Sequence, residues 1–198
     1  MEEVKIKEKK SSSIKDFITI GIVLVLHYVI FMISAPLGMT GVGNIFVYPL
    51  CSLLWGTLFI LLCKKVDKPV LIMIYPLILA LIQFMNFWAT GVIGLIAAVA
   101  VFAILQFMDS SKFSTIAIAY TTMITILYLG ATVPVLLFKD MFFELMPQYA
   151  DLYLQVYNAL SGYLFFAGLA AAVVCAILGA LLGRKLLKKH FEKSGIAI

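Results

Sequence analysis

Residues 160–193 read LSGYLFFAGLAAAVVCAILGALLGRKLLKKHFEK, an apolar run followed at once by a basic one. From Leu160 to Leu182 this stretch contains no Asp, Glu, Lys or Arg. A helix needs about 20 apolar residues to cross the ~30 Å hydrocarbon core of a bilayer. Lys and Arg beside such a span are retained on the cytoplasmic side. The stretch therefore predicts a transmembrane helix whose C-terminal end faces the cytoplasm.

The same apolar character extends over the whole chain. Of its 198 residues 64% are hydrophobic and only 13% are charged, and the mean hydropathy is +1.10. Soluble domains are nearer half apolar and a quarter charged, and in lipid a chain must satisfy its own backbone hydrogen bonds. We therefore predict an all-α membrane protein, a bundle of six transmembrane helices. The five further spans are Phe17–Ala35, Ile45–Cys63, Pro69–Trp88, Thr90–Met108 and Phe113–Phe138.

Polar ends bound this predicted transmembrane domain of residues 17–183. Residues 1–16 are charged and serine-rich, and residues 184–198 form a basic tail. Between the third and fourth spans, residues 86–91 leave almost no loop, so we expect a tight hairpin; five helices with one re-entrant segment are the alternative. The first span resembles a signal peptide, but Pro36 makes a poor cleavage context, and we expect a retained helix.

The lysines and arginines predict the orientation. With the N-terminus inside, 14 of the 15 Lys and Arg residues fall in cytoplasmic segments, and only Lys139 is outside. This asymmetry predicts a multi-pass protein of the cell membrane with both termini in the cytoplasm. The basic runs would lie beside anionic lipid headgroups, or would dock a cytoplasmic partner. Without a folded soluble module, we expect no binding to nucleic acid.

Two connections are predicted on the outer side. Residues 36–44 are uncharged and rich in Pro and Gly, which is typical of a mobile, turn-rich segment. Residues 139–157 combine aromatic, Met and acidic residues, which predicts an amphipathic piece at the membrane interface. Within it, Tyr149, Tyr153 and Tyr157 recur every four residues, so they share one helical face. They form either an aromatic belt or a lid over a ligand.

The predicted spans carry no catalytic set. They contain no Asp, Glu, Lys or Arg, and the chain has neither an evident Ser/His/Asp set nor an HExxH motif. We therefore expect neither an enzyme nor an ion-coupled transporter. Cys51, Cys63 and Cys175 lie in apolar stretches without a CxxC pair, which indicates small buried side chains rather than a disulfide framework or a metal site.

A few polar and aromatic residues near the outer ends of the spans form the predicted substrate site. An apolar pocket with a few convergent polar groups is what a small-molecule site needs. His27, in the first span, could ligate a haem iron; alternatively it is a neutral histidine hydrogen-bonded to a carbonyl or a tyrosine hydroxyl on another helix. The predicted substrate-binding residues are His27, Asn44, Tyr48, Gln83, Asn86 and Trp88.

Small residues in the last span form a ladder at four-residue spacing. Such residues let helices approach closely, either within one chain or against a partner. The predicted partner-docking residues are Gly168, Ala172, Ala176 and Ala180.

The two ends of the chain carry a resemblance to a known family. The start Ile14-Lys-Asp-Phe-Ile-Thr-Ile-Gly-Ile22 and the ending at residues 179–196, GALLGRKLLKKHFEKSGI, resemble those of the Trep_Strep integral membrane proteins. That family is grouped with the substrate-binding S components of energy-coupling factor (ECF) transporters. The resemblance implies a six-helix protein that captures a micronutrient outside the cell, with the loop after the first span as the gate of its pocket.

The resemblance also implies partners and a substrate class. A membrane T component and two cytosolic ABC ATPases would drive release, so ATP would be used by the partners and this chain needs no cofactor. Haem or an iron chelate is the first substrate hypothesis, and a vitamin-like or pterin-like heterocycle is the alternative. The first span lacks the AxxxA-type motif with which many S components meet the T component. The hypothesis from another class is a structural or regulatory membrane subunit without a ligand.

Overall fold

The computed structural model describes residues 14–145 and 147–193, which form helices and turns and no strand. Six of the described helices are long and apolar enough to cross a membrane. These are α1 (Ile14–Gly38), α2 (Gly41–Lys65), α3 (Pro69–Asn86), α4 (Trp88–Phe107), α5 (Phe113–Leu137) and α8 (Leu164–Lys193). The predicted all-α fold with six candidate spans is therefore confirmed.

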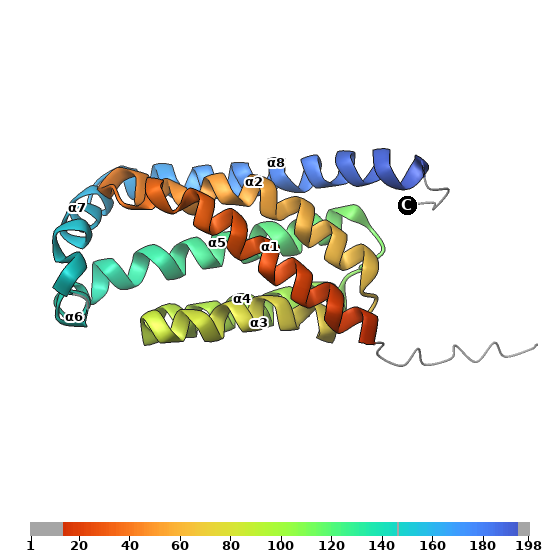
Figure 1. Cartoon of the computed structure of the whole chain (residues 1–198), viewed down its shortest axis with the longest axis horizontal. Helices are drawn as coiled ribbons and strands as arrows, with labels where there is room; N and C mark the ends of the chain where they lie inside the picture. The colour runs from red at the N-terminus through yellow and green to blue at the C-terminus, as the bar shows by residue number, and fades with distance from the viewer. Residues whose placement is uncertain (1–13, 146, 194–198) are drawn as a thin grey trace, which may run out of the picture.

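Three short elements connect α5 to α8: α6 (Lys139–Leu145), a 3₁₀ turn η1 (Pro147–Tyr149) and α7 (Ala150–Leu160). They lie at one end of the bundle, which we call the α7 end (Figure 1). The α1–α2 turn and the α3–α4 hairpin are at this end too. The opposite end, here called the terminal end, carries the start of α1, the end of α8 and the α2–α3 and α4–α5 turns. The described residues of the predicted interfacial piece, 139–145 and 147–157, are thus helical.

The α3–α4 hairpin is as tight as its sequence predicts. Phe87 alone separates the two helices, with extended backbone, and its N–H donates to the carbonyl of Gln83. Trp88 starts α4, so the observed boundary falls two residues before the predicted one. α3 and α4 are two separate helices, each long and apolar enough to cross a membrane.

The prediction of a turn-rich loop at residues 36–44 is wrong. Helix α1 continues through Pro36 to Gly38 and α2 begins at Gly41, so only two residues separate them. The Thr40 hydroxyl accepts from the N–H of Gly43, at 3.1 Å, and caps α2. The Asn44 amide donates to the carbonyl of Gly38, at 3.0 Å, and satisfies the end of α1. Side-chain capping here outweighs the turn preference of Pro and Gly.

Two described helices extend past the predicted ends of the transmembrane domain. Helix α1 starts at Ile14, inside the segment predicted as residues 1–16, whereas residues 1–13 lie outside the described part. Helix α8 runs on to Lys193, through the predicted start of the basic tail at residue 184. A span and its basic extension form one helix because no proline lies between Leu182 and Lys193.

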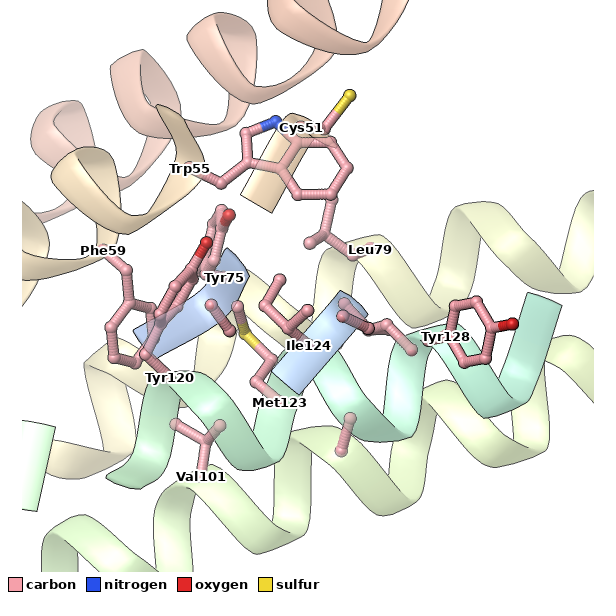
Figure 2. Packing of buried hydrophobic residues seen from close by; sticks show 14 of the residues in the cluster. Cys51, Trp55, Phe59, Tyr75, Leu79, Val101, Tyr120, Met123, Ile124 and Tyr128 are labelled. Carbon is pink, nitrogen blue, oxygen red and sulfur yellow. The ribbon is translucent and has the colours of Figure 1, made fainter. Parts of the chain in front are cut away.

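The centre of the bundle is an aromatic core (Figure 2). Trp55 and Phe59 of α2, Tyr75 of α3 and Tyr120 of α5 are completely buried there. The Tyr120 hydroxyl donates to the carbonyl of Ser52 in α2, so a polar tip in the core has a partner on another helix. By contrast, α1 exposes mostly apolar side chains, as a lipid-facing helix would.

Candidate ligand-binding site

A hollow at the α7 end lies between α1, α2 and α7 and has a volume of about 320 Å³. It is open on one side, and its wall is mainly aromatic and aliphatic with a few polar tips. We call it the tyrosine pocket. Its lining residues are Phe31, Met32, Ala35, Gly38, Met39, Asn44, Val47, Tyr48, Tyr149, Leu152 and Tyr153.

Helix α7 forms one wall of this pocket because it lies directly against the start of α2. A Cβ on Gly41 would come within 2.6 Å of the Cβ of Gln155, so only glycine permits this approach. Tyr153 packs on Phe142 of α6, with ring centroids 5.1 Å apart. The amphipathic α7 thus places one tyrosine face over the α1–α2 turn.

Two of the predicted site residues are in the pocket. Asn44 lines the pocket, and its amide N–H donates to the carbonyl of Gly38. Tyr48 sets its ring edge-on to Trp55, with centroids 5.8 Å apart, and beside Phe31 at 6.3 Å. These contacts hold the Tyr48 ring in one orientation.

Two tyrosines of the pocket come from the 139–157 connection. Of the predicted tyrosine face, Tyr149 and Tyr153 line the pocket. Tyr157 instead lies under the Lys139 ammonium, which is 4.6 Å from its ring centroid. Burial, and to a lesser extent Tyr149, raises the pKa of Tyr153, so this residue is a neutral phenol at physiological pH. The four-residue spacing could have placed these tyrosines in a site, whereas nothing in the sequence singled out Phe31.

His27 lies outside the pocket wall. Its ring stacks on Trp55 at a centroid distance of 3.9 Å, and its Nδ1 is 2.7 Å from the Tyr75 hydroxyl. The Trp55 indole N–H donates to the His27 carbonyl, at 3.1 Å. His27 is only 6% exposed. This is the second predicted arrangement, a histidine bonded to a tyrosine hydroxyl on another helix, and it does not place His27 in position to ligate a haem.

The other three predicted pocket residues are elsewhere, which corrects the single site expected from sequence. Gln83 lies in α3 with its Oε1 buried and unpartnered, whereas Asn86 is exposed. Trp88 is 49% exposed and packs on Phe138, with centroids 5.3 Å apart. All three share the α7 end with the tyrosine pocket but belong to the α3–α4 hairpin. Residues at the same end of the bundle can lie on different helix pairs, so the shared end does not bring these residues into one site.

The predicted partner-docking ladder is also corrected. Ala172, Ala176 and Ala180 are completely buried within the chain. A Cβ on Gly168 would collide with the Tyr128 hydroxyl. The ladder is therefore an internal packing face of α8, and it presents no surface to a partner.

A larger hollow, of about 640 Å³, lies between α1 and α3. Its wall includes Leu24, Val29 and Ile78, and Tyr28 supplies its one phenol. Small-molecule sites combine apolar walls with a few placed polar groups, and this hollow lacks an amide or a charge. Among the described residues, no group of three or more His, Cys, Asp or Glu side chains gathers where a metal ion could be held. The tyrosine pocket is therefore the better candidate site.

Six apolar spans around an aromatic core, with a polar-tipped pocket at one end, define a polytopic integral membrane protein. The chain belongs to the Trep_Strep family, described as hypothetical bacterial integral membrane proteins, whose sequence model matches residues 14–193. No curated protein and no solved structure matches the chain.

Proposed function

We propose that this protein is the substrate-capturing S component of an ECF-type importer in a bacterial cell membrane. The observation that carries the proposal is the tyrosine pocket, which lies at the end of the bundle opposite the basic terminal end. With the basic end in the cytoplasm, the pocket opens toward the outside, where a substrate must be captured.

The pocket wall favours one class of substrate. It contains three tyrosines and one asparagine but no charged side chain. Its volume of about 320 Å³ is near the lower end of the ~300–1,000 Å³ range of small-molecule sites. A flat, neutral heterocycle of vitamin or pterin type suits both properties, since aromatic rings can stack on it and Asn44 can bond its edge.

Haem or an iron chelate is the weaker substrate hypothesis. His27, the residue proposed as the iron ligand, is engaged by Trp55 and Tyr75 and does not line the pocket. Adding haemin to purified protein should therefore give no shifted Soret band that depends on His27. A shifted band that disappears in His27→Ala would restore haem as the substrate.

Energy for transport would come from partners. The sequence has no nucleotide-binding motif, and the predicted spans lack charged residues that could couple transport to ions. A T component and two ABC ATPases would supply the energy. Purification of the tagged protein from its host in mild detergent, followed by mass spectrometry, tests this. Recovery of two ATPases and a second membrane protein would support the importer, whereas a different stoichiometric complex would favour a structural or regulatory subunit.

Thermal unfolding with a panel of pterins and vitamin-like heterocycles tests the pocket itself. A ligand present at 100 times its Kd stabilises the folded protein by about 2.7 kcal/mol, which raises Tm by roughly 5–11 °C for a chain of this size. Tyr153→Ala and Asn44→Ala should abolish this rise. Tyr163→Ala is the matched control, because Tyr163 is 79% exposed and does not line the pocket. A rise that survives both pocket variants would place the ligand elsewhere.

A further inference from the structure

The larger hollow between α1 and α3, of about 640 Å³, adjoins the tyrosine pocket. We call it the α1–α3 groove. On the α1 side it is lined by residues between Leu24 and Ile33, and on the α3 side by Ile78 and Ile82. Met32 of α1 lines both the groove and the pocket. The two hollows therefore meet at one side chain.

One side of α1 runs from the groove into the tyrosine pocket. Tyr28 lines the groove, Met32 lines both hollows, and Ala35 and Met39 line the pocket. These residues are four, three and four positions apart, so they follow one another along the same side of the helix. The groove and the pocket thus lie on one continuous surface of α1.

The groove opens sideways, toward the bilayer. Val25 and Val29 in its wall are exposed, and both lie within a candidate membrane span. Short turns join α1 to α2 and α3 to α4 at the α7 end, and the ends of α1 and α3 lie well apart there (Figure 1). A ligand in the groove would therefore contact hydrocarbon on its open side.

The two hollows offer different chemistry to a ligand. The pocket wall carries three tyrosines and Asn44, which suit a ring with polar edges. The described residues that line the groove are aliphatic apart from Met32 and Tyr28, so they offer mainly van der Waals contact to an apolar chain. A flat ring that bears an apolar tail has the same two kinds of surface, side by side.

The methionine at the junction suits the passage of a tail. Its side chain is unbranched and has three rotatable bonds, so it adapts to irregular contacts. Met32 is 60% exposed, so its side chain can turn toward lipid without leaving a cavity in the core. Joining the two hollows in this way requires no movement of the backbone.

We propose that the substrate is an amphiphile, with a flat, neutral ring in the tyrosine pocket and an alkyl or isoprenoid tail along the α1–α3 groove. This inference rests on the proposed function and narrows its substrate class to rings that carry an apolar tail. Such a substrate dissolves in the bilayer and enters the pocket sideways, past Met32. A tailless substrate captured from water would instead leave the groove to bilayer lipid.

Equilibrium dialysis of the full-length protein in detergent tests the proposal with 2-methyl-4-quinolone and 2-heptyl-4-quinolone as probes. The two share a flat, neutral ring and differ only in the length of the tail. We expect the unmodified protein to bind both. Ile78→Trp fills part of the groove and should weaken binding of the heptyl probe about 5- to 150-fold, the range that overpacking costs. The methyl probe should change less than twofold.

The matched control is Leu81→Trp, which adds the same side chain three residues further along α3. Leu81 is 53% exposed and lines neither hollow. Binding of both probes should change less than twofold in this variant. Since the same detergent is present in every sample, partition of the tail into micelles cancels between variants.

The outcomes separate the tail from the ring. Binding of the methyl probe alone to the unmodified protein would assign the groove to bilayer lipid or a partner helix; the tail proposal would be wrong and the ring site would stand. Equal weakening of both probes in Ile78→Trp would also overturn the tail. Binding of neither probe would reject the neutral-ring ligand of the proposed function, and the tail with it.

If Ile78→Trp fails to fold, photo-crosslinking of the unmodified protein replaces it. The probe is then 2-heptyl-4-quinolone with a diazirine at the end of its tail. We expect crosslinks within residues 24–33 of α1 or 78–82 of α3, and excess unmodified probe should suppress them. Crosslinks confined to α7 or α8 would overturn the proposal.

Discussion

His27 of α1 bonds polar groups on two other helices. Its Nδ1 bonds the Tyr75 hydroxyl of α3, and its carbonyl accepts from Trp55 of α2. Its ring also stacks on the Trp55 indole, nearly parallel at 11°. In lipid a buried polar group needs a partner within the protein. His27 therefore links α1 to α2 and α3.

Tyr75→Phe removes the partner of the His27 ring and keeps the shape of the side chain. Interhelical hydrogen bonds in membranes contribute on the order of 1 kcal/mol, which corresponds to a fall in Tm of roughly 2–4 °C. Thermal unfolding in detergent measures it. Tyr163→Phe removes an exposed hydroxyl and should leave Tm unchanged. An unchanged Tm in Tyr75→Phe would mean that His27 finds another partner.

At the scale of elements, the closest packing in the described chain is that of α8 on α2. Gly56 of α2 meets Gly179 of α8, and a Cβ on Gly183 would lie 2.8 Å from the Cα of Thr57. Lipid gives helices no hydrophobic reason to associate, so close van der Waals contact is the main attraction. The small residues of α8 act here, inside one chain.

Gly179→Ala should destabilise this helix pair. Its Cβ would lie 3.0 Å from the Cα of Leu53 and closer still to the carbonyl of Ser52, so the backbones must separate. Overpacking of this kind costs typically 1–3 kcal/mol, and thermal unfolding should show it. Gly21→Ala is the matched control, because a Cβ there meets nothing within 4 Å. That variant should be neutral or slightly stabilised, since alanine favours a helix by about 1 kcal/mol. Equal Tm values for the two would contradict the packing.

For the whole molecule, the two ends of the bundle differ in chemistry. The terminal end carries Lys64, Lys112, Arg184 and Lys188 and both described chain ends. The α7 end carries the tyrosine pocket, with Lys139 in a cation–π contact with Tyr157. The proposed importer component would need two such different ends, with substrate entering at one and partners acting at the other.

Cysteine labelling in intact cells tests the predicted orientation. A membrane-impermeant maleimide should label Lys139→Cys, which lies at the α7 end, and should not label Lys112→Cys in the α4–α5 turn. The unmodified protein supplies the background from Cys51, Cys63 and Cys175, which lie in α2 and α8. Labelling of Lys112→Cys alone would invert the topology, and the tyrosine pocket would then open to the cytoplasm.

Local sequence was sufficient to predict the helices, but it was insufficient to predict which residues form the candidate site. The six spans, the α3–α4 hairpin and the helical parts of the 139–157 connection follow from hydropathy and from short-range rules, because a bilayer requires each span to satisfy its own backbone. The 36–44 segment was the exception, because Thr40 and Asn44 cap the helices there.

Only the tertiary structure separates Asn44 and Tyr48, which line the pocket, from Gln83, Asn86 and Trp88, which do not. The tertiary structure also determines that Ala172 is buried inside the bundle and that His27 has partners on α2 and α3. The physical reason is that hydropathy depends on residues adjacent in the chain. Which helix faces which depends instead on contacts such as Gly56 with Gly179 and Gly41 with Gln155, between residues far apart in sequence.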